Sequence, residues 1–287
     1  TSSAGVYTIS YNTGLVLGKT GYTLTPGGPV YWTVTPRPLN VAVTKTYDGS
    51  STFNSGFVLS GLVNGDSAPT VAGSATVGSR NAGRYSSFDS STLSLSSSNY
   101  VLNASGVSAS IDPRPIMVAA DAKSKVYGNV DPNLTYQVTK GALVEGDSLS
   151  GALRRVAGEN VGSYTIDASA LANGNYVVTA HNGALSIDAR PITVTADAKS
   201  KVYGNVDPGL TYQVTQGSLV AGDSLGGVLR RAAGENVGSY TIDASALANG
   251  NYVVTAHDGA LSIAARPITV TADAKSKVYG NVDPGLR

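Results

Sequence analysis

The chain has 287 residues with no cysteine, one Met, one Trp, three Phe and sixteen Tyr, and only 14% of its residues are charged. The lack of cysteine excludes a disulfide framework, a thiolate zinc site and a cysteine nucleophile. A formal charge of +1 offers no attraction to nucleic acid or to an anionic membrane, so we expect neither as a partner. The sequence contains neither an apolar run long enough to span a membrane nor the signature of a signal peptide, so we expect a soluble chain whose export signal lies outside it.

Arg-Pro dipeptides divide the chain into repeats. The arginines are 77, 76 and 76 residues apart, at Arg37, Arg114, Arg190 and Arg266. Residues 114–189 and 190–265 differ at 11 of 76 positions, so the two copies must share one fold. Residues 36–112 carry the same landmarks more loosely, with Tyr47-Asp48-Gly49 where the later copies have Tyr-Gly.

The two ends of the chain read as parts of further repeats. Residues 4–9 echo residues 161–166, so residues 1–35 are interpreted as the C-terminal half of a preceding repeat. Residues 266–287 match only the opening of a repeat. We therefore expect a piece of a longer array, with segments at 1–35, 36–112, 113–189, 190–265 and 266–287.

Apolar residues alternate with a period of two within residues 113–189, which predicts short, half-buried strands. Met117 and Ala119 are replaced by Thr193 and Thr195 in the next copy, so these positions are predicted to face outward. The alternating positions are Ile116 and Val118, then Leu134, Tyr136 and Val138, then Tyr164, Ile166 and Ala168, then Tyr176, Val178 and Ala180, and finally Leu185 and Ile187.

Turn signals separate these strands. His181-Asn182-Gly183 predicts a hairpin, because Asn-Gly between alternating strands favours a two-residue turn. Glu145-Gly146-Asp147 is typical of a turn, and residues 167–172 have room for at most a short helical turn. Six or seven short strands per repeat predict an all-β fold of tandem, small, immunoglobulin-like β-sandwiches. Units resembling the β-grasp fold are the alternative.

The joints between repeats are short. Only residues 188–191 separate two predicted strands, and Pro191 keeps the preceding residue extended. Tyrosine is the main large core residue, so its hydroxyl must reach solvent or a polar partner. A repeat this small is expected to draw stability from its neighbours. We therefore predict a semi-rigid, monomeric rod, with about 30 to 40 Å per repeat and more than about 100 Å in total.

No residue pattern predicts a metal or cofactor site. His181 and His257 are read as turn residues, because a zinc site needs three or four converging ligands. Aspartates of the later repeats are the only candidates for calcium, but they do not form a dense acidic loop and are read as turn or cap residues. These aspartates are Asp121, Asp131, Asp147, Asp197, Asp207 and Asp223.

Charged side chains offer two further candidates. Arg154 and Arg155 with Glu159, repeated as Arg230, Arg231 and Glu235, have the composition of a carbohydrate or carboxylate clamp. A solvated strand end with a weak ion pair is the preferred interpretation. An intramolecular Lys–Asn isopeptide bond is the other candidate, from Lys123 and Lys125 with Asn160 and Glu159. We do not expect this bond, because lysine is rarely buried.

Catalysis has no candidate residues in this sequence. Serine, histidine and aspartate are present, but no G-x-S-x-G elbow or other activating arrangement accompanies them, so we expect no enzyme. Asn103-Ala104-Ser105 and Asn133-Leu134-Thr135 are acceptor sequons that matter only in a cell that glycosylates them.

Several landmarks in fixed order resemble a known family of repeats. They are Arg190–Ala196, Lys201–Gly204, Asp207-Pro208, Leu210–Tyr212, Leu219–Asp223, Ala233–Tyr240 and Asn251-Tyr252. Residues 113–189 and 190–265 resemble the bacterial MBG repeat of the Tyr-Gly type. Residues 36–112, with Lys45-Thr46-Tyr47-Asp48-Gly49, resemble the related YDG repeat.

The resemblance implies a stalk or spacer in a large exported bacterial protein. Such proteins are similar to filamentous haemagglutinin, and many of them are adhesins of two-partner secretion. The expected location is the cell surface in association with the outer membrane, and the implied role is attachment or biofilm formation. Partners would then be host or matrix glycans, proteins or neighbouring cells, reached through the parent protein. The alternative is that each repeat binds a glycan or mucin weakly and that tandem copies multiply the avidity. The lack of an exposed aromatic stripe favours the spacer.

Overall fold

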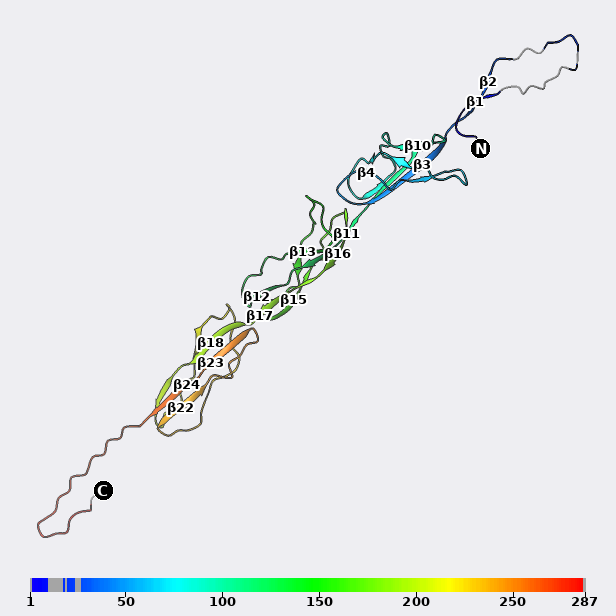
Figure 1. The fold of residues 1–287 in the computed structure, drawn as a ribbon. Coiled ribbons are helices and arrows are strands. Elements are labelled where there is room, and N and C mark those ends of the chain that lie inside the picture. Colours follow the sequence, from blue (N-terminus) through cyan, green and yellow to red (C-terminus); the bar gives the residue numbers. More distant parts are fainter. Residues whose placement is uncertain (1, 10–17, 19, 24–26, 286–287) are drawn as a thin grey trace. The chain divides into compact units, whose positions relative to one another are not determined.

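The computed structural model describes residues 2–9, 18, 20–23 and 27–285 (Figure 1). The described residues form strands, turns and loops but no helix, so none of them provides a helix that could cross a membrane. The predicted all-β class and tandem organisation are confirmed. The helical turn considered at residues 167–172 is a tight turn closed by the hydrogen bond from Leu171 N to Ala168 O at 3.1 Å.

Contacts group the chain into two compact units. The first is Thr1–Asp121, Leu134–Arg154 and Ile166–Gly183, and the second is Ala122–Asn133, Arg155–Thr165 and Ala184–Arg287.

The first unit contains the whole of residues 36–112. Two long strands, β3 (Arg37–Thr46) and β10 (Tyr100–Asp112), pair in parallel at its centre. Leu39, Val41 and Val43, at every second position of β3, are buried, which is the expected period for a strand with one face on a core. Shorter strands complete this part of the fold: β5 (Val58–Ser60) and β8 (Gly83–Tyr85) flank the long pair, while β4 (Thr52–Phe53) pairs with β7 (Ala75–Thr76) and β6 (Val71–Ala72) with β9 (Ser94–Leu95).

The second unit contains the whole of residues 190–264, folded as two sheets with a parallel pair in each. In one sheet β18 (Arg190–Ala196) lies between β20 (Tyr212–Gln216) and β23 (Tyr252–His257), parallel to β23. The other has the order β19 (Lys199–Val202), β24 (Gly259–Ala264), β22 (Gly238–Asp243) and β21 (Arg230–Arg231), with β19 and β24 parallel. The strand number agrees with the prediction, but sheets of the immunoglobulin type are antiparallel, and alternation alone did not reveal the parallel pairs.

Residues 113–189 carry the same strands. A three-stranded sheet comprises β13 (Tyr136–Lys140), β11 (Arg114–Ala120) and β16 (Tyr176–His181), and a four-stranded sheet comprises β12 (Lys123–Val126), β17 (Gly183–Asp188), β15 (Gly162–Asp167) and β14 (Arg154–Arg155). Ile116 and Val118 are buried, whereas the intervening Met117 and Ala119 are half-buried. The predicted direction of the two faces is therefore confirmed.

The predicted hairpin at residues 181–183 is wrong. β16 and β17 belong to different sheets, and Asn182 joins them as the chain passes from one sheet to the next. A type I′ turn needs positive φ at Asn182 and Gly183, and neither is among the residues with positive φ. Gly183 is required for another reason, because a Cβ there would lie 2.7 Å from the Ala120 carbonyl oxygen. The Asn182 side chain accepts a hydrogen bond from Ala168 N at 3.0 Å.

The connections between successive repeats are as short as predicted. β10 ends at Asp112 and β11 begins at Arg114, and β17 ends at Asp188 where β18 begins at Arg190.

The outer segments are partly described. Near the N-terminus β1 (Gly5–Ile9) pairs with β2 (Val30–Val34) in the register that β22 has with β24, Gly5 opposite Val34. Residues 265–285 form no strand. Residues 1, 10–17, 19, 24–26, 286 and 287 of the two predicted partial repeats lie outside the described residues.

Candidate functional site

Landmarks that are distant in sequence meet where one repeat joins the next. In the second unit, the Tyr127 hydroxyl donates a hydrogen bond to Asp223 Oδ2 at 2.9 Å, and the Tyr252 hydroxyl donates to the same oxygen at 2.5 Å. The two rings meet edge to face, with centroids 5.5 Å apart and planes at 76°. Tyr252 Oη also accepts from Val220 N at 2.8 Å. The Tyr-Gly turn of one repeat thus occupies a site formed by the Gly-Asp and Asn-Tyr landmarks of the next.

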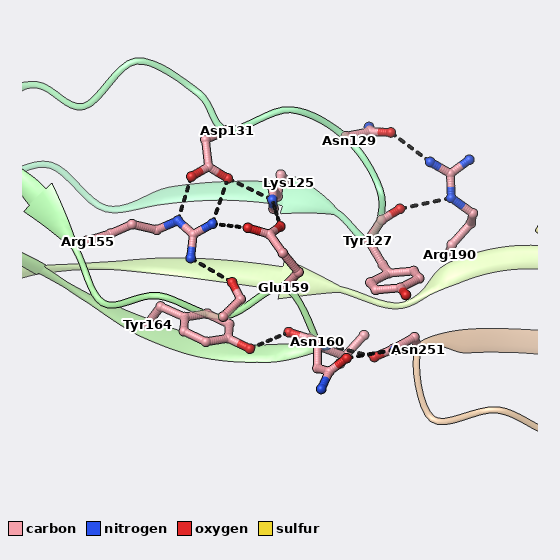
Figure 2. A network of polar contacts seen from close by, with 12 residues as sticks. Lys125, Tyr127, Asn129, Asp131, Arg155, Glu159, Asn160, Tyr164, Arg190 and Asn251 are labelled. Carbon is pink, nitrogen blue, oxygen red and sulfur yellow. Dashed lines mark hydrogen bonds and ion pairs between the residues drawn. The ribbon is translucent and has the colours of Figure 1, made fainter. Parts of the chain in front are cut away.

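The glycine and the arginine among these landmarks each have a structural role at this joint. Gly128 has a φ of +79°, and a Cβ on it would lie 2.4 Å from Val220 Cγ2, so only glycine fits. Arg190 Nε donates to the Tyr127 carbonyl oxygen at 2.8 Å and its Nη2 donates to Asn129 Oδ1 at 2.8 Å (Figure 2). Arg266 makes the same two contacts with Tyr203 and Asn205, so Arg190 and Arg266 each hold the turn of the repeat before them.

A second contact closes the same joint through asparagine. Asn251 Oδ1 accepts from Val161 N at 3.0 Å, and Asn251 Nδ2 donates to Asn160 Oδ1 at 3.0 Å. The Tyr164 hydroxyl in turn donates to the Asn160 carbonyl oxygen at 2.8 Å (Figure 2). These bonds position the loop before β15 against the next repeat.

The first unit repeats this arrangement. Tyr47 and Tyr176 donate to Asp147 Oδ2 at 2.9 and 2.7 Å, and their rings are 5.5 Å apart at 75°. Asn175 Oδ1 accepts from Ala82 N at 2.8 Å, as Asn251 accepts from Val161 N. We refer to the Tyr–Asp–Tyr contacts, Tyr47–Asp147–Tyr176 and Tyr127–Asp223–Tyr252, as the tyrosine joints.

The tyrosine joint of the first unit titrates at both ends of the pH scale. The hydrogen bond from Tyr176, with that from Tyr47 and the Arg80 charge, lowers the pKa of Asp147 below 3.8. Burial and the hydrogen bond to Asp147 raise the pKa of Tyr47 above 10.0. The stabilisation from Asp147 is therefore present above pH 3.8 and lost as the pH falls, and that from Tyr47 is present below pH 10.0 and lost as the pH rises.

We expect the melting temperature to be constant between about pH 5 and 9 and to fall outside that range. Thermal melts followed by circular dichroism at a series of pH values measure this. Asp147→Asn is the control, because it should weaken the acid-side loss while the alkaline loss remains. An unchanged acid limb in that variant would contradict the assignment.

A network of four charged residues lies within the second unit, and we name it the Lys125 network. Lys125 Nζ donates to Asp131 Oδ1 at 2.7 Å and to Glu159 Oε2 at 2.5 Å. Arg155 donates through Nε to Asp131 at 2.5 Å and through Nη2 to Glu159 (Figure 2). The Arg155 guanidinium also bonds the Gly158 carbonyl at 2.6 Å and lies over the Tyr164 ring at 5.6 Å. Lys201, Asp207, Arg231 and Glu235 form the same network one repeat later.

Family models match most of the chain. The model described as YDG domain matches residues 35–109, and the model described as MBG domain (YGX type) matches residues 116–186 and 192–262. The chain belongs to the MBG and YDG repeat families. No curated protein matches it significantly. Residues 35–109 are the YDG domain below, and residues 116–186 and 192–262 are the first and second MBG domains.

The structure places the charged candidates of the MBG domains in other surroundings than the sequence predicted. Lys125 is buried, with 8% of its surface exposed, although lysine was not expected in the interior. Arg155 is part of the Lys125 network rather than a solvated strand end, whereas Arg154 is exposed. Because the network balances two cations with two carboxylates and uses their polar atoms internally, it has little capacity to clamp a carboxylate or sugar.

The remaining candidates are dispersed. His181 and His257 are exposed on β16 and β23. Asp121 accepts hydrogen bonds from Thr135 and Gln137, as a residue that fixes a loop does. Asp147 and Asp223, predicted as turn residues, are the acceptors of the tyrosine joints. Within the described part of the chain, no group of three His, Asp or Glu side chains gathers in a way that could hold a metal ion.

The contacts of Lys125 oppose an isopeptide bond. Amide formation needs a neutral amine and a protonated carboxyl. Burial by itself lowers the pKa of Lys125, but its hydrogen bonds to Asp131 and Glu159 outweigh burial and raise it. Arg155, followed by Lys125, lowers the pKa of Asp131, so both groups remain charged. Asn160, the partner considered from the sequence, is bonded to Asn251 and Tyr164 instead.

We therefore expect the intact mass of the purified protein to equal the sum of its residues. Each Lys–Asp or Lys–Glu amide would lower that mass by one water molecule, and each Lys–Asn amide would lower it by one ammonia molecule. Mass spectrometry of the denatured chain measures the difference, and Lys125→Ala combined with Lys201→Ala provides the reference in which no such bond can form. A deficit of one or two waters, or of one or two ammonia molecules, in the natural sequence alone would contradict the expectation.

Sequence reasoning missed the tyrosine joints. It recognised Tyr-Gly, Gly-Asp and Asn-Tyr as repeat landmarks but assigned Gly-Asp to a turn and gave the two tyrosines no shared contact. The available signal was their joint occurrence in every full repeat, which indicates one shared contact. Sequence alone did not show that the tyrosine of one repeat meets the aspartate of the next.

Proposed function

We propose that the chain is a spacer segment of a large bacterial surface adhesin, in which its repeats provide length and stiffness for attachment or biofilm formation. MBG and YDG domains are repeat domains typical of large surface proteins, and three of them follow one another here. The tyrosine joint is the observation that carries the proposal, because a joint built from buried side chains resists bending.

The details of the joint support this role. One residue separates the last strand of a domain from the first strand of the next, so the connection has no flexible linker. Bending there would withdraw Tyr127 from Asp223 and Tyr252 and would break the bonds between Asn251, Asn160 and Val161. Since each contact is local, identical domains can be added without changing the others, which suits an array whose length is its function.

The chemistry of the side chains favours a structural role over catalysis. Four charged residues of each MBG domain are paired within one network, and the tyrosine hydroxyls of the joints donate to aspartates. In this proposal the protein lies at the bacterial surface after secretion, resembling proteins of the filamentous haemagglutinin type. Other parts of the parent protein would contact host, matrix or neighbouring cells.

Small-angle X-ray scattering of the whole chain tests the spacer. We expect a maximum dimension above about 100 Å, from about 3.3 Å per strand residue, and a lower value or a broader distance distribution for Tyr127→Ala. A radius of gyration near the roughly 19 Å of a compact chain of this length would contradict the proposal.

Binding to a glycan array or to mucin provides the second arm of the test. A spacer should show no saturable binding, in the natural chain or in Tyr127→Ala. Saturable binding that grows with the number of MBG domains would contradict the spacer and support the multivalent binding module.

A further inference from the structure

Four Asn-Gly pairs occur in the chain, beginning at Asn64, Asn173, Asn182 and Asn249. Asparagine followed by glycine is especially prone to spontaneous deamidation, because glycine has no side chain to shield its backbone nitrogen. The reaction requires this nitrogen to reach the side-chain carbonyl carbon of the asparagine. A fold that holds the asparagine side chain in another position therefore suppresses the reaction, and a fold that leaves the side chain free permits it.

Hydrogen bonds hold the asparagine at two of these pairs through both ends of its amide. Asn173 donates through Nδ2 to the Ser148 carbonyl oxygen at 2.8 Å, and its Oδ1 accepts from Asn175 N at 2.9 Å. Asn249 makes the equivalent two bonds one repeat later. Each side chain must break both bonds before it can turn toward the following glycine.

Asn182 is held as well. Its Oδ1 accepts a hydrogen bond from Ala168 N at 3.0 Å. The Gly183 that follows is the first residue of β17, a strand that is paired on both sides. The sheet therefore restricts the backbone nitrogen, and the hydrogen bond restricts the side chain.

Asn64 lies in a freer position. It is exposed in the turn between Val63 and Asp66, which is closed by the hydrogen bond from Asp66 N to Val63 O at 3.1 Å. Gly65 has a φ of +91°, so the turn favours glycine directly after Asn64. Among the residues that the structure describes, neither the Asn64 side chain nor the Gly65 backbone nitrogen has a hydrogen-bond partner. Both reacting groups are therefore available.

The exposure of Asn64 is a property of the turn itself. Glu145 and Ala221 occupy the same position in the MBG domains, and both are exposed although the tyrosine joint beside each of them is complete. A repeat that precedes the YDG domain would thus leave Asn64 open to water. The reactive pair is also particular to the YDG domain, because Glu-Gly and Ala-Gly have no amide side chain to lose.

The turn that carries Asn64 holds a buried tyrosine. Val63 N donates to Tyr100 Oη at 3.2 Å, and the Tyr100 hydroxyl donates to Asp66. Tyr100 is 7% exposed. Asn64 and Gly65 lie between the two residues that make these contacts, so a change in the length of the main chain at Asn64 moves one contact relative to the other.

We propose that Asn64 is a site of spontaneous deamidation and that its isoaspartate product weakens the hold of this turn on Tyr100. The Gly65 nitrogen attacks Asn64 Cγ, and the new N–Cγ bond closes a succinimide as the Cγ–Nδ2 bond breaks. The amide nitrogen leaves as ammonia and takes up, through solvent, the proton that the Gly65 nitrogen loses. The modification is independent of the spacer role, since it requires only this turn and water.

Water then opens the succinimide at one of its two C–N bonds. Cleavage of the bond to Cγ gives aspartate with the original main chain. Cleavage of the bond to the Asn64 main-chain carbonyl carbon gives isoaspartate, in which the chain runs through the side chain and gains one methylene. Both products add a negative charge, but only isoaspartate lengthens the turn between Val63 and Asp66.

Ageing of the whole folded chain in mildly alkaline buffer, followed by mass spectrometry of its peptides, tests the site. Deamidation exchanges ammonia for water and raises the mass, whereas an isopeptide bond lowers it. We expect Asn64 to react at least about fivefold faster than the other three asparagines, because each of those must first release a side-chain hydrogen bond. Ageing in concentrated urea is the control, in which all four pairs should react at similar rates. Equal rates in the folded chain, or a preference for Asn64 that persists in urea, would overturn the proposal.

Hydrogen exchange measures the effect on the turn. The aged chain is separated by ion exchange, since each product carries an added negative charge, and Asn64→Gln should greatly reduce this fraction. Freshly prepared Asn64→Asp is the matched control, because it has the added charge without the added methylene. We expect the Val63 amide to exchange at least about fivefold faster in the isoaspartate form than in Asn64→Asp, since its hydrogen bond to Tyr100 is weakened. Equal exchange in the two forms would overturn the proposed effect on Tyr100.

Discussion

Replacing Tyr127 by alanine is expected to lower the free energy of unfolding by about 3 kcal/mol, as for other buried aromatic residues. The substitution removes the edge contact with Tyr252 and the hydrogen bond to Asp223, and it leaves an unfilled space at the joint. Urea denaturation measures the change. Tyr127→Phe keeps the ring and should cost about 1 kcal/mol, the usual value of one hydrogen bond.

Tyr203→Ala is the matched control. Tyr203 has the same neighbours in sequence and the same backbone contacts, with its amide on Ala264 and its carbonyl on Arg266. Tyr203 is 47% exposed, whereas Tyr127 is 8% exposed. We expect a loss below about 1 kcal/mol, as is usual for exposed sites. Equal losses for the two variants would show that the tyrosine stabilises its own domain and not the joint.

Replacing Lys125 by alanine is expected to lower the free energy of unfolding by about 2 kcal/mol, the value of hydrogen bonds to charged groups. The Lys125 side chain is 4% exposed, and its loss leaves Asp131 and Glu159 with Arg155 alone. Both carboxylates retain contact with solvent, which limits the cost. Urea denaturation, with hydrogen exchange of β12 as a local probe, measures the effect.

Lys277→Ala provides the comparison. Lys277 occupies the same place in the repeated sequence and pairs with Asp283, but both side chains are solvent-exposed. An exposed ion pair contributes about 0 to 1 kcal/mol, so we expect almost no change. A Lys125→Ala variant as stable as Lys277→Ala would show that burial adds nothing to the Lys125 network.

The tyrosine joint and the Lys125 network stabilise different parts of this array. The network uses residues of one MBG domain and fixes the loops around β12, so it stabilises that domain by itself. The joint uses residues of two domains, so its stability depends on the neighbour. Stability in such arrays is a sum of domain terms and nearest-neighbour terms, and the two substitutions above address one term each.

Much of this architecture was predictable from residue patterns. Alternation in Ile116–Val118 and Leu185–Ile187 predicted strands and their buried faces, because a strand exposes alternate side chains to opposite sides. The spacing of Arg-Pro predicted the repeats and their short connections. Asn182-Gly183 misled the same reasoning, since the local turn preference was overridden by the passage of the chain between two sheets and by the close approach of Gly183 to Ala120.

The amino-acid sequence by itself determined the all-β class, the repeats and the extended links between them, because strand periodicity and proline restriction act over a few neighbouring residues. Only the tertiary structure decided which strands are parallel and that Lys125 is buried among charges. It also decided that Tyr127 meets Asp223. Lys125 meets Glu159 at a separation of 34 positions and Tyr127 meets Asp223 at a separation of 96, and such pairings depend on the shape of the whole fold rather than on any local preference.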